Sequence, residues 1–271
     1  MNECRNFEAS PKARPPFFAG VLDAETLGEI EKRPQGDLAK AAAECSAIEI
    51  RYDLFLSAGF PAESLGKIAA RVLNALPKAL LMGTIRLKRD GGTFPDEGSL
   101  SRAELFRSIL RESVHPDYID IEAEEFVSLE SEIRNVWTRE CGGKIPLLDE
   151  TSKKILVSHH DFQKVPAIGE LDRLRACAAE WKCAGFKVAC MSASEGDFDS
   201  VYPWIKSVAD GSWRFALISC FAMGKTGESS RIGSLEFGAN LTYCSLGKAV
   251  APGQIPIREA REAYRNRISK V

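Results

Sequence analysis

The chain has 271 residues, enough for one large domain or two small ones and for a sizeable hydrophobic core. Its 36 Lys and Arg residues nearly balance its 38 Asp and Glu residues, and the formal net charge of -2 argues against a nucleic-acid binder that acts through bulk electrostatics. No apolar run approaches the roughly 18 residues of a membrane span, and the N-terminus lacks the apolar core of a signal peptide. We therefore expect a cytoplasmic protein with neither a membrane nor a nucleic-acid partner.

The eight cysteines form no C-x-x-C pair of the kind that binds zinc. Three of them, Cys190, Cys220 and Cys244, lie inside apolar strand-like runs, where a reduced and buried thiol is the usual state. We therefore expect neither a disulfide framework nor a metal site.

Short apolar runs recur along the whole chain, and several are apolar on both faces, as in a parallel sheet that is covered by helices. The eight runs span residues 17–22, 47–55, 79–87, 118–123, 154–161, 186–191, 215–223 and 240–246. Longer segments with helical spacing separate them, such as 61–76, which starts at Pro61, and 170–184. Eight strand-then-helix units in about 250 residues predict a (β/α)₈ TIM barrel of the α/β class.

A doubly wound open sheet is the rival architecture. It usually carries a Gly-rich loop after an early strand, and no G-x-G-x-x-G occurs in this sequence. No low-complexity linker divides the chain. We predict a single barrel domain over residues 16–271 and a loose N-terminal tail over residues 1–15.

Polar residues gather at the C-terminal ends of the runs, where the active site of a (β/α)₈ barrel lies. Glu49, Arg51 and Asp53 occupy alternate positions, which a strand would direct to one side. They fit a structural ion network equally well. The later candidates, which also fit ordinary turns or solvated side chains, are Arg86, Asp90, His159, His160, Asp161, Arg231 and Gln254.

Lys187 stands near the start of an apolar run, where a charged amine is unfavourable unless it reaches solvent, pairs or loses its proton. A lysine that only reaches solvent is the more common case. Desolvation beside other cations, however, makes a lysine amine a nucleophile toward carbonyl groups. An inward Lys187 on a barrel strand therefore suggests Schiff-base chemistry.

The doublet His159 and His160 offers such a lysine an acid–base partner. Adjacent strand residues face opposite sides, so at most one of the two shares the barrel interior with Lys187. The alternation alone does not say which. An imidazole titrates near neutrality, so the inward one could take a proton from an imine-activated carbon and return one to a leaving hydroxyl.

In order and spacing, six segments resemble type I 3-dehydroquinate dehydratase, the Schiff-base enzyme of the shikimate pathway. They are EIRYDLF (49–55), TIRLKRDGG (84–92), ILVSHHDF (155–162), FKVACM (186–191), FAMGKTGESSRI (221–232) and APGQIPI (251–257). The resemblance runs from about Phe17 to Ile257.

This resemblance implies a (β/α)₈ barrel, usually a homodimer, that converts the small molecule 3-dehydroquinate to 3-dehydroshikimate and water with no metal or organic cofactor. By motif, Lys187 would form the imine with the substrate ketone. His160, directly before Asp-Phe, would be the general acid and base, whereas the family motif does not require a histidine at His159. Asp90 stands where the family has a glutamate that supports this histidine.

The resemblance also assigns substrate-binding roles. Arg231 and Gln254 would hold the substrate carboxylate, which suits the planar two-pronged donor of an arginine. Glu49, Arg51 and Arg86 would bind the ring hydroxyls and fix the ring for elimination.

The pocket wall departs from the family pattern at several positions. Met223 keeps a wall position, whereas Phe221 and Tyr243 replace a methionine and a phenylalanine. Val250 replaces a serine that would contact the substrate. A lost hydrogen bond to a charged group can cost roughly 1.5 to 3 kcal/mol, so weaker binding or a shifted substrate would follow.

Two other functions fit parts of the sequence. Another Schiff-base barrel, such as a class I aldolase, also needs an inward lysine, but Arg231 and Gln254 suit a carboxylate better than a sugar phosphate. A catalytically retired barrel that binds a shikimate-like ligand is supported only by Asp90 and Val250. Because Lys187, His160, Arg231 and Gln254 occur together, we favour the dehydratase.

Overall fold

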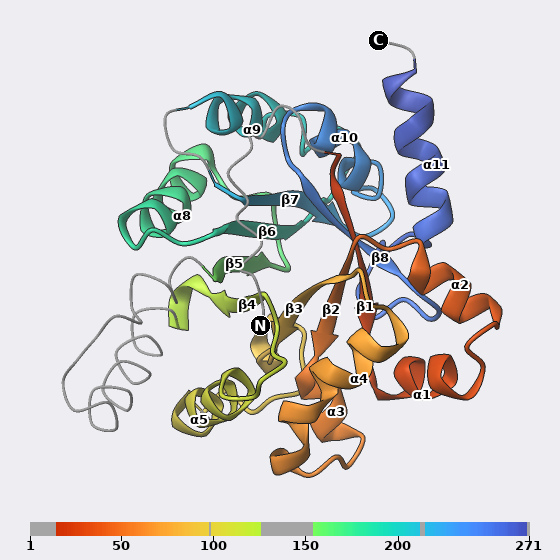
Figure 1. Ribbon diagram of the computed structural model, residues 1–271. Helices are drawn as coiled ribbons and strands as arrows, with labels where there is room; N and C mark the ends of the chain where they lie inside the picture. Colours follow the sequence, from red (N-terminus) through yellow and green to blue (C-terminus); the bar gives the residue numbers. More distant parts are fainter. Residues whose placement is uncertain (1–14, 98, 126–153, 212–214, 270–271) are drawn as a thin grey trace.

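The structure is a computed structural model and describes residues 15–97, 99–125, 154–211 and 215–269. Its centre is one sheet of eight parallel strands in the order β7-β6-β5-β4-β3-β2-β1-β8. The strands are β1 (Phe17–Leu22), β2 (Ala47–Arg51), β3 (Leu80–Thr84), β4 (Tyr118–Glu122), β5 (Ile155–Asp161), β6 (Gly185–Met191), β7 (Leu217–Met223) and β8 (Leu241–Ser245). The sheet curls into a nearly closed barrel (Figure 1), which confirms the predicted (β/α)₈ fold.

Helices follow the strands and surround the barrel (Figure 1). They are α1 (Ala24–Lys32), α2 (Asp37–Ala43), α3 (Tyr52–Ser57), η2 (Ala62–Lys67), α4 (Ile68–Ala75), η3 (Lys88–Asp90), α5 (Ser99–Leu110), α8 (Ile168–Glu180), α9 (Val201–Asp210), α10 (Ser230–Glu236) and α11 (Ile257–Ile268). Within the described ranges, no helix has the length and apolar character needed to cross a membrane. The predicted N-terminal tail lies outside the described residues except for Pro15, so its prediction stays open.

Asn240 links the first and last strands of the sheet order. Its side chain accepts a hydrogen bond from Ile218 N and donates one to Ala216 O, both at 2.8 Å, at the start of β7. Its own backbone carbonyl accepts from Phe17 N at 2.8 Å, at the start of β1. One asparagine before β8 therefore connects the strands on both sides of it.

Alternate residues of each strand face the barrel interior, because a strand has a two-residue period. The interior begins with an apolar layer that includes Ala47, Leu80, Leu156, Leu217 and Leu241. Two positions further along β2, β4 and β6 come Glu49, Asp120 and Lys187, all buried. The larger apolar cluster fills the space between the sheet and the helices. The interior thus changes from apolar to charged toward the C-terminal ends of the strands.

Two of the predicted elements illustrate how the structure differs from the sequence pattern, one in where it ends and one in helix type. The run 47–55 is a strand only to Arg51, and helix α3 begins at Tyr52. Tyr52 and Phe55 are both 0% exposed, three residues apart, which is helical spacing that packs them against the core. Likewise, the predicted helix 61–76 is a 3₁₀ helix to Lys67 and an α-helix from Ile68.

Five cysteines in the described ranges, Cys45, Cys177, Cys190, Cys220 and Cys244, are free thiols. Cys190, Cys220 and Cys244 are buried in strands, as their apolar surroundings predict. Burial raises the pKa of Cys190 to about 12, so this thiol stays protonated and is a poor nucleophile near neutral pH.

Candidate active site

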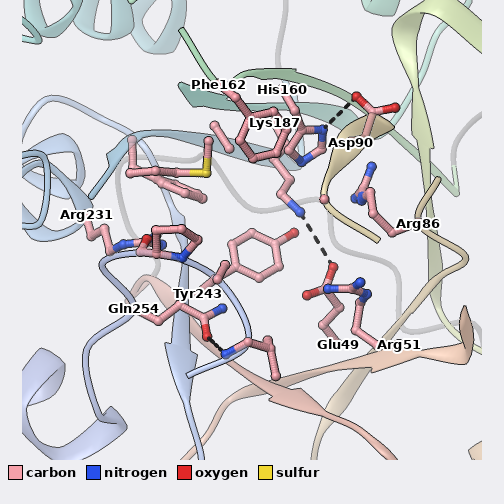
Figure 2. Close-up of a pocket in the computed structure, with 17 residues that line it drawn as sticks. Glu49, Arg51, Arg86, Asp90, His160, Phe162, Lys187, Arg231, Tyr243 and Gln254 are labelled. Carbon is pink, nitrogen blue, oxygen red and sulfur yellow. Dashed lines mark hydrogen bonds and ion pairs between the residues drawn. The ribbon is translucent and has the colours of Figure 1, made fainter. Parts of the chain in front are cut away.

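A pocket of about 570 Å³, partly open to solvent, lies where the charged interior meets the strand-end loops. Figure 2 shows Lys187 near its centre, with His160 and Asp90 on one side and Arg231 and Gln254 on another. The structure brings into its lining all ten residues that the sequence predicts as site residues: Glu49, Arg51, Arg86, Asp90, His160, Lys187, Met223, Arg231, Tyr243 and Gln254.

The alternation of strand β5 separates the two histidines. Ser158 and His160 face the interior, where Ser158 pairs in register with Lys187 of β6. His159 faces the other way and contacts Glu124, with 2.6 Å between its Nδ1 and the carboxylate Oε1. This hydrogen bond raises the pKa of His159. Only His160 therefore shares the pocket with the lysine.

Lys187 is 5% exposed and contacts two carboxylates and an aromatic ring. Its Nζ donates to Oδ2 of Asp120 at 3.0 Å and lies 3.5 Å from Oε1 of Glu49. The amine also lies 4.1 Å from the ring centre of Tyr243. Sequence reasoning favours cations as neighbours of this lysine, but the groups nearest to its amine are carboxylates.

Asp120, which sequence reasoning missed, is held on both of its oxygens. Ser158 donates to Oδ1 at 2.5 Å, and Nη2 of Arg86 lies 2.7 Å from Oδ2. Burial alone would raise the pKa of Asp120, but the charges of Arg86 and Lys187 hold it well below its usual range. Asp120 is therefore a fixed, ionised carboxylate beside the lysine.

Glu122 extends this network away from the pocket. Its carboxylate accepts from Nη1 of Arg86 at 2.7 Å and from Nη2 of Arg102, which lies on helix α5. The side chains of Glu122 and Arg102 are both 0% exposed. A sequence signal for this network exists in YIDIE, where Asp120 and Glu122 alternate along a strand as Glu49 and Arg51 do.

Arg51 and Asp53 form a bidentate pair, with both nitrogen–oxygen distances 2.8 Å. The predicted strand geometry of Asp53 is wrong, because this residue lies in the first turn of α3. Thr93 N and Oγ1 also donate to its carboxylate, at 3.1 and 3.3 Å. Burial alone would raise the pKa of Asp53, but Arg51 lowers it below its usual value. Asp53 thus orients Arg51 at the pocket edge.

Replacing Asp53 with asparagine is expected to destabilise the fold by about 3 to 5 kcal/mol at neutral pH, because Arg51 is left buried without its partner. A lowered carboxylate pKa stabilises the folded state above the unfolded value of about 3.9, and this stabilisation is lost as the pH falls further. Urea unfolding should therefore show a weaker loss of stability below pH 4 in the variant. The control Asp37→Asn, at an exposed aspartate, should change neither the free energy of unfolding at neutral pH nor its decrease below pH 4. An effect of Asp37→Asn as large as that of Asp53→Asn would contradict the role given to the Arg51–Asp53 pair.

His160 lies against Asp90 without a hydrogen bond between them. The distance from Nδ1 to the carboxylate Oδ1 is 3.9 Å, and within the described residues neither His160 Nδ1 nor Asp90 Oδ2 has a hydrogen-bonding partner. Burial, then Arg86 and Lys187, lower the pKa of His160 well below 6.5. Burial, together with Glu122, raises the pKa of Asp90 to about 6. His160 is therefore neutral near pH 7 and suited to accept a proton.

Arg231 carries unused donors into the pocket. It lies in the first turn of α10, its Nη2 donates to Pro252 O at 2.9 Å, and its guanidinium lies 4.1 Å from the ring centre of Phe221. Within the described part of the chain, its Nε and Nη1 have no hydrogen-bonding partner. Burial lowers its pKa to about 10, which still leaves it charged at neutral pH. This guanidinium can bind an anion.

Gln254 lies in the loop between β8 and α11, which packs on the loop after β7. Its Oε1 accepts from Val250 N at 3.0 Å, so its NH₂ group is the end left to donate (Figure 2). Gly253 has a φ of 70°, and a Cβ there would approach Gly224 O to 2.5 Å. A glycine is therefore needed where the two loops meet, and this contact places Gln254 and Val250 at the pocket.

Val250 lines the pocket, and Val250→Ser would place a hydroxyl donor on this wall, as the resemblance implies for the family. We expect this hydroxyl to hydrogen-bond the ligand and to lower KM about tenfold with little change in kcat. Steady-state kinetics measure this change. Ala249→Ser, at the exposed neighbouring position, should leave both constants unchanged. An unaltered KM in Val250→Ser would mean that the substrate does not reach this part of the wall.

Within the described ranges, no group of three or more His, Cys, Asp or Glu side chains is arranged to hold a metal ion. Glu49, one of the carboxylates that line the pocket, is instead engaged by a cation and a hydroxyl group. Glu49 accepts from Thr84 Oγ1 at 2.8 Å on the same oxygen that faces the lysine.

A family model described as Type I 3-dehydroquinase matches residues 28–270. A 3-dehydroquinate dehydratase from Klebsiella pneumoniae subsp. pneumoniae is 30% identical over 248 residues, which cover 89% of this chain and 89% of that protein. One from Pyrobaculum aerophilum is 28% identical over 251 residues, 87% of this chain and 67% of that protein.

Solved structures agree in fold. Type I 3-dehydroquinate dehydratase from Clostridium difficile matches with a TM-score of 0.74 at 20% identity, over 95% of this chain and 94% of that one. The enzyme from Aquifex aeolicus matches with a TM-score of 0.67 at 25% identity, over 94% and 100%.

Proposed function

The chain belongs to the type I 3-dehydroquinase family, and from this premise we propose that it converts 3-dehydroquinate to 3-dehydroshikimate and water through an imine on Lys187. Family membership makes it a hydro-lyase and confirms the resemblance drawn from the sequence. The observation that supports the imine most directly is a buried amine, Lys187, in one pocket with a buried imidazole, His160.

In the first step, Nζ of Lys187 adds to the ketone carbon of the substrate. The amine must first lose a proton, and we assign this proton to Glu49, 3.5 Å away, because Arg86 and Ser158 already hold Asp120. The nitrogen passes one of its two remaining protons to the former carbonyl oxygen, protonated Glu49 supplies the second, and this oxygen leaves as water. The product of this step is a positively charged imine.

In the second step, neutral His160 takes a proton from the carbon beside the imine. The electron pair of that bond forms a carbon–carbon double bond, and the imine becomes a neutral enamine. The imidazolium then gives its proton to the ring hydroxyl, which leaves as water while the charged imine forms again. Hydrolysis releases the product and Lys187. Such proton transfer typically contributes about 10² to 10⁴ in rate.

The other pocket residues bind and orient the substrate. Arg231 offers to the carboxylate the two nitrogens that have no hydrogen-bonding partner among the described residues, and Gln254 offers its NH₂ group. Glu49, Arg51 and Arg86 line the side where the ring hydroxyls would lie. Met223 and Tyr243 would form the apolar walls, and Asp90 would support His160 once the two approach closer than 3.9 Å.

Reductive trapping tests this proposal. The protein is incubated with 3-dehydroquinate, reduced with borohydride and mapped by peptide mass spectrometry, while formation of 3-dehydroshikimate is followed separately. We expect a substrate-derived mass on Lys187 and turnover. Lys225, exposed on the loop after β7, is the internal control and should remain unmodified. Labelling of Lys225 in place of Lys187, or no labelling in a folded sample, would reject the proposal.

A barrel that binds a shikimate-like ligand without turnover is the second candidate. The observations that favour it are the 3.9 Å gap between His160 and Asp90 and the apolar Val250. Binding of 3-dehydroquinate by calorimetry with neither an adduct nor product would support this candidate. A class I aldolase would instead form an adduct with a ketose phosphate. The pair of Arg231 and Gln254 suits a carboxylate better than a phosphate, so we do not favour this function.

We further propose that the protein is a cytoplasmic homodimer with a single catalytic domain over residues 16–271. These properties come from the family resemblance and the sequence. Sedimentation velocity at micromolar concentration measures the dimer, and a monomer under conditions of full activity would contradict it.

A further inference from the structure

The nitrogen of Lys187 is surrounded before any substrate arrives. Asp120 lies 3.0 Å from it, Glu49 3.5 Å, and the ring centre of Tyr243 4.1 Å. A protonated imine keeps one N–H in place of the three of an ammonium group. Only one acceptor can then receive a straight hydrogen bond, and the closer one is Asp120.

The buried charges of this region form a continuous network. Its members, each at most 5% exposed, are Arg102, Glu122, Arg86, Asp120, Lys187 and Glu49. Three of these side chains are basic and three acidic, so their charges balance only while the nitrogen of Lys187 is protonated. A neutral imine would leave one buried carboxylate uncompensated, which is costly in a region shielded from water.

Other charged and titratable groups around the network do not offer that missing charge. Arg51 is already paired with Asp53, and burial keeps His160 neutral at pH 7. The remaining neighbours that line the pocket are Asp90, Arg231 and the neutral Tyr243. Arg231 lies on the side of the pocket away from Glu49 and Arg86, where it is available to the substrate carboxylate (Figure 2).

More contacts hold the carboxylate of Asp120 than hold that of Glu49. Asp120 is therefore better suited to keep a constant negative charge beside the nitrogen of Lys187. Both of its oxygens are engaged, Oδ1 by Ser158 at 2.5 Å and Oδ2 by Arg86 at 2.7 Å. Glu49 is held by the hydroxyl of Thr84 alone among the side chains that donate a hydrogen bond to it in the described ranges. Glu49 is therefore the carboxylate with the freedom to carry protons.

We infer that Asp120 is the counterion that keeps the imine nitrogen protonated throughout the reaction, an inference that rests on the function proposed above. The charge on nitrogen is needed because a charged imine receives the electron pair of the broken C–H bond and becomes a neutral enamine. A neutral imine would have to become an anion. Asp120 thus acts on the reactivity of the imine, whereas Glu49 and His160 move protons.

The test compares two reductants. Borohydride reduces imines in either protonation state, whereas cyanoborohydride reduces the protonated form much faster. The amount of Lys187 adduct trapped by cyanoborohydride is divided by the amount trapped by borohydride, over a pH series from neutral to alkaline. This ratio reports the protonation state of the imine independently of how much imine forms. A model imine of 3-dehydroquinate with butylamine gives the unperturbed profile.

For the wild type we expect a ratio that stays constant well above the pH at which the model imine loses its proton. In Asp120→Asn the midpoint should fall by about 1 to 3 pH units toward the model. Ser158→Ala, which removes a hydrogen bond to Asp120 but keeps its charge, should stay close to the wild type. Circular dichroism checks that each variant folds.

Two kinds of outcome contradict the inference alone, and a further one contradicts it together with the proposed function. If the wild-type profile follows the model imine, the protein supplies no counterion, and this result does not depend on any variant. If Asp120→Asn keeps the wild-type profile, or if Glu49→Gln shifts it further than Asp120→Asn does, the counterion lies elsewhere. Absence of any adduct in the wild type would defeat the proposed function and this inference together, whereas the first two outcomes leave the proposed function intact.

Discussion

Replacing Lys187 with methionine is expected to reduce turnover of 3-dehydroquinate by a factor on the order of 10⁶, the loss typical of a covalent enzyme without its nucleophile. Methionine keeps an unbranched side chain of similar length but cannot form an imine. Binding should survive in part, because Arg231 and Gln254 lie on a different side of the pocket. Steady-state kinetics, borohydride trapping and calorimetry measure the three effects.

The matched control is Lys225→Met, at an exposed lysine on the loop after β7. It should retain wild-type kcat and KM. Because Lys187→Met leaves Asp120 and Glu49 without their cation, its stability is measured alongside. Turnover above one thousandth of wild type in a folded Lys187→Met protein would exclude this lysine as the nucleophile.

Replacing His160 with alanine is expected to lower kcat by about 10² to 10⁴ while imine formation continues. Lys187 retains its contacts, so the substrate still attaches, but the proton beside the imine is no longer removed. Borohydride should then trap an adduct that is heavier by one water than the adduct of the dehydrated product. Mass spectrometry of the Lys187 peptide distinguishes the two.

His159→Ala should leave both activity and adduct mass close to wild type, because His159 points away from the pocket toward Glu124. The pH profile gives a second check. Burial, Arg86 and Lys187 lower the pKa of His160 in the free protein, so the acid limb of kcat/KM is expected below pH 6.5. A larger loss in His159→Ala than in His160→Ala would reverse the assignment of the doublet.

The barrel was predictable because its strands are buried on both faces and recur at a spacing that leaves room for one helix. What the pattern could not locate was the point where a strand ends. Tyr52 and Asp53 continue the apolar alternation of β2 in the sequence, yet they belong to α3, since Tyr52 and Phe55 pack on one helical face.

The pocket residues were predictable where polar side chains follow a strand or match a family motif. Asp120 and Glu122 lie within β4 rather than after it, and Arg102 reaches Glu122 from helix α5, so nothing in the sequence around Arg102 indicates this contact. The strand alternation alone left both histidines of the doublet open, and the family motif favoured His160; the register that pairs Ser158 with Lys187 then places His160 on the inner side of β5. The sequence does indicate a shorter reach at Asp90, because an aspartate is one methylene shorter than the glutamate that the family has there, but the size of the gap to His160, 3.9 Å, depends on where the backbone places the two residues.

The enclosed contact between Arg102 and Glu122 also limits how this chain can evolve. A mutation that removes only one of these two charges leaves the other buried without its partner. Such a mutation is expected to lower the free energy of unfolding by about 3 to 5 kcal/mol. Loss of the charges together, with apolar residues of similar volume, is far less harmful. Drift at these positions must therefore proceed in coupled steps, and substitutions at 102 and 122 should appear jointly along a lineage even though Arg102 lies outside the pocket lining.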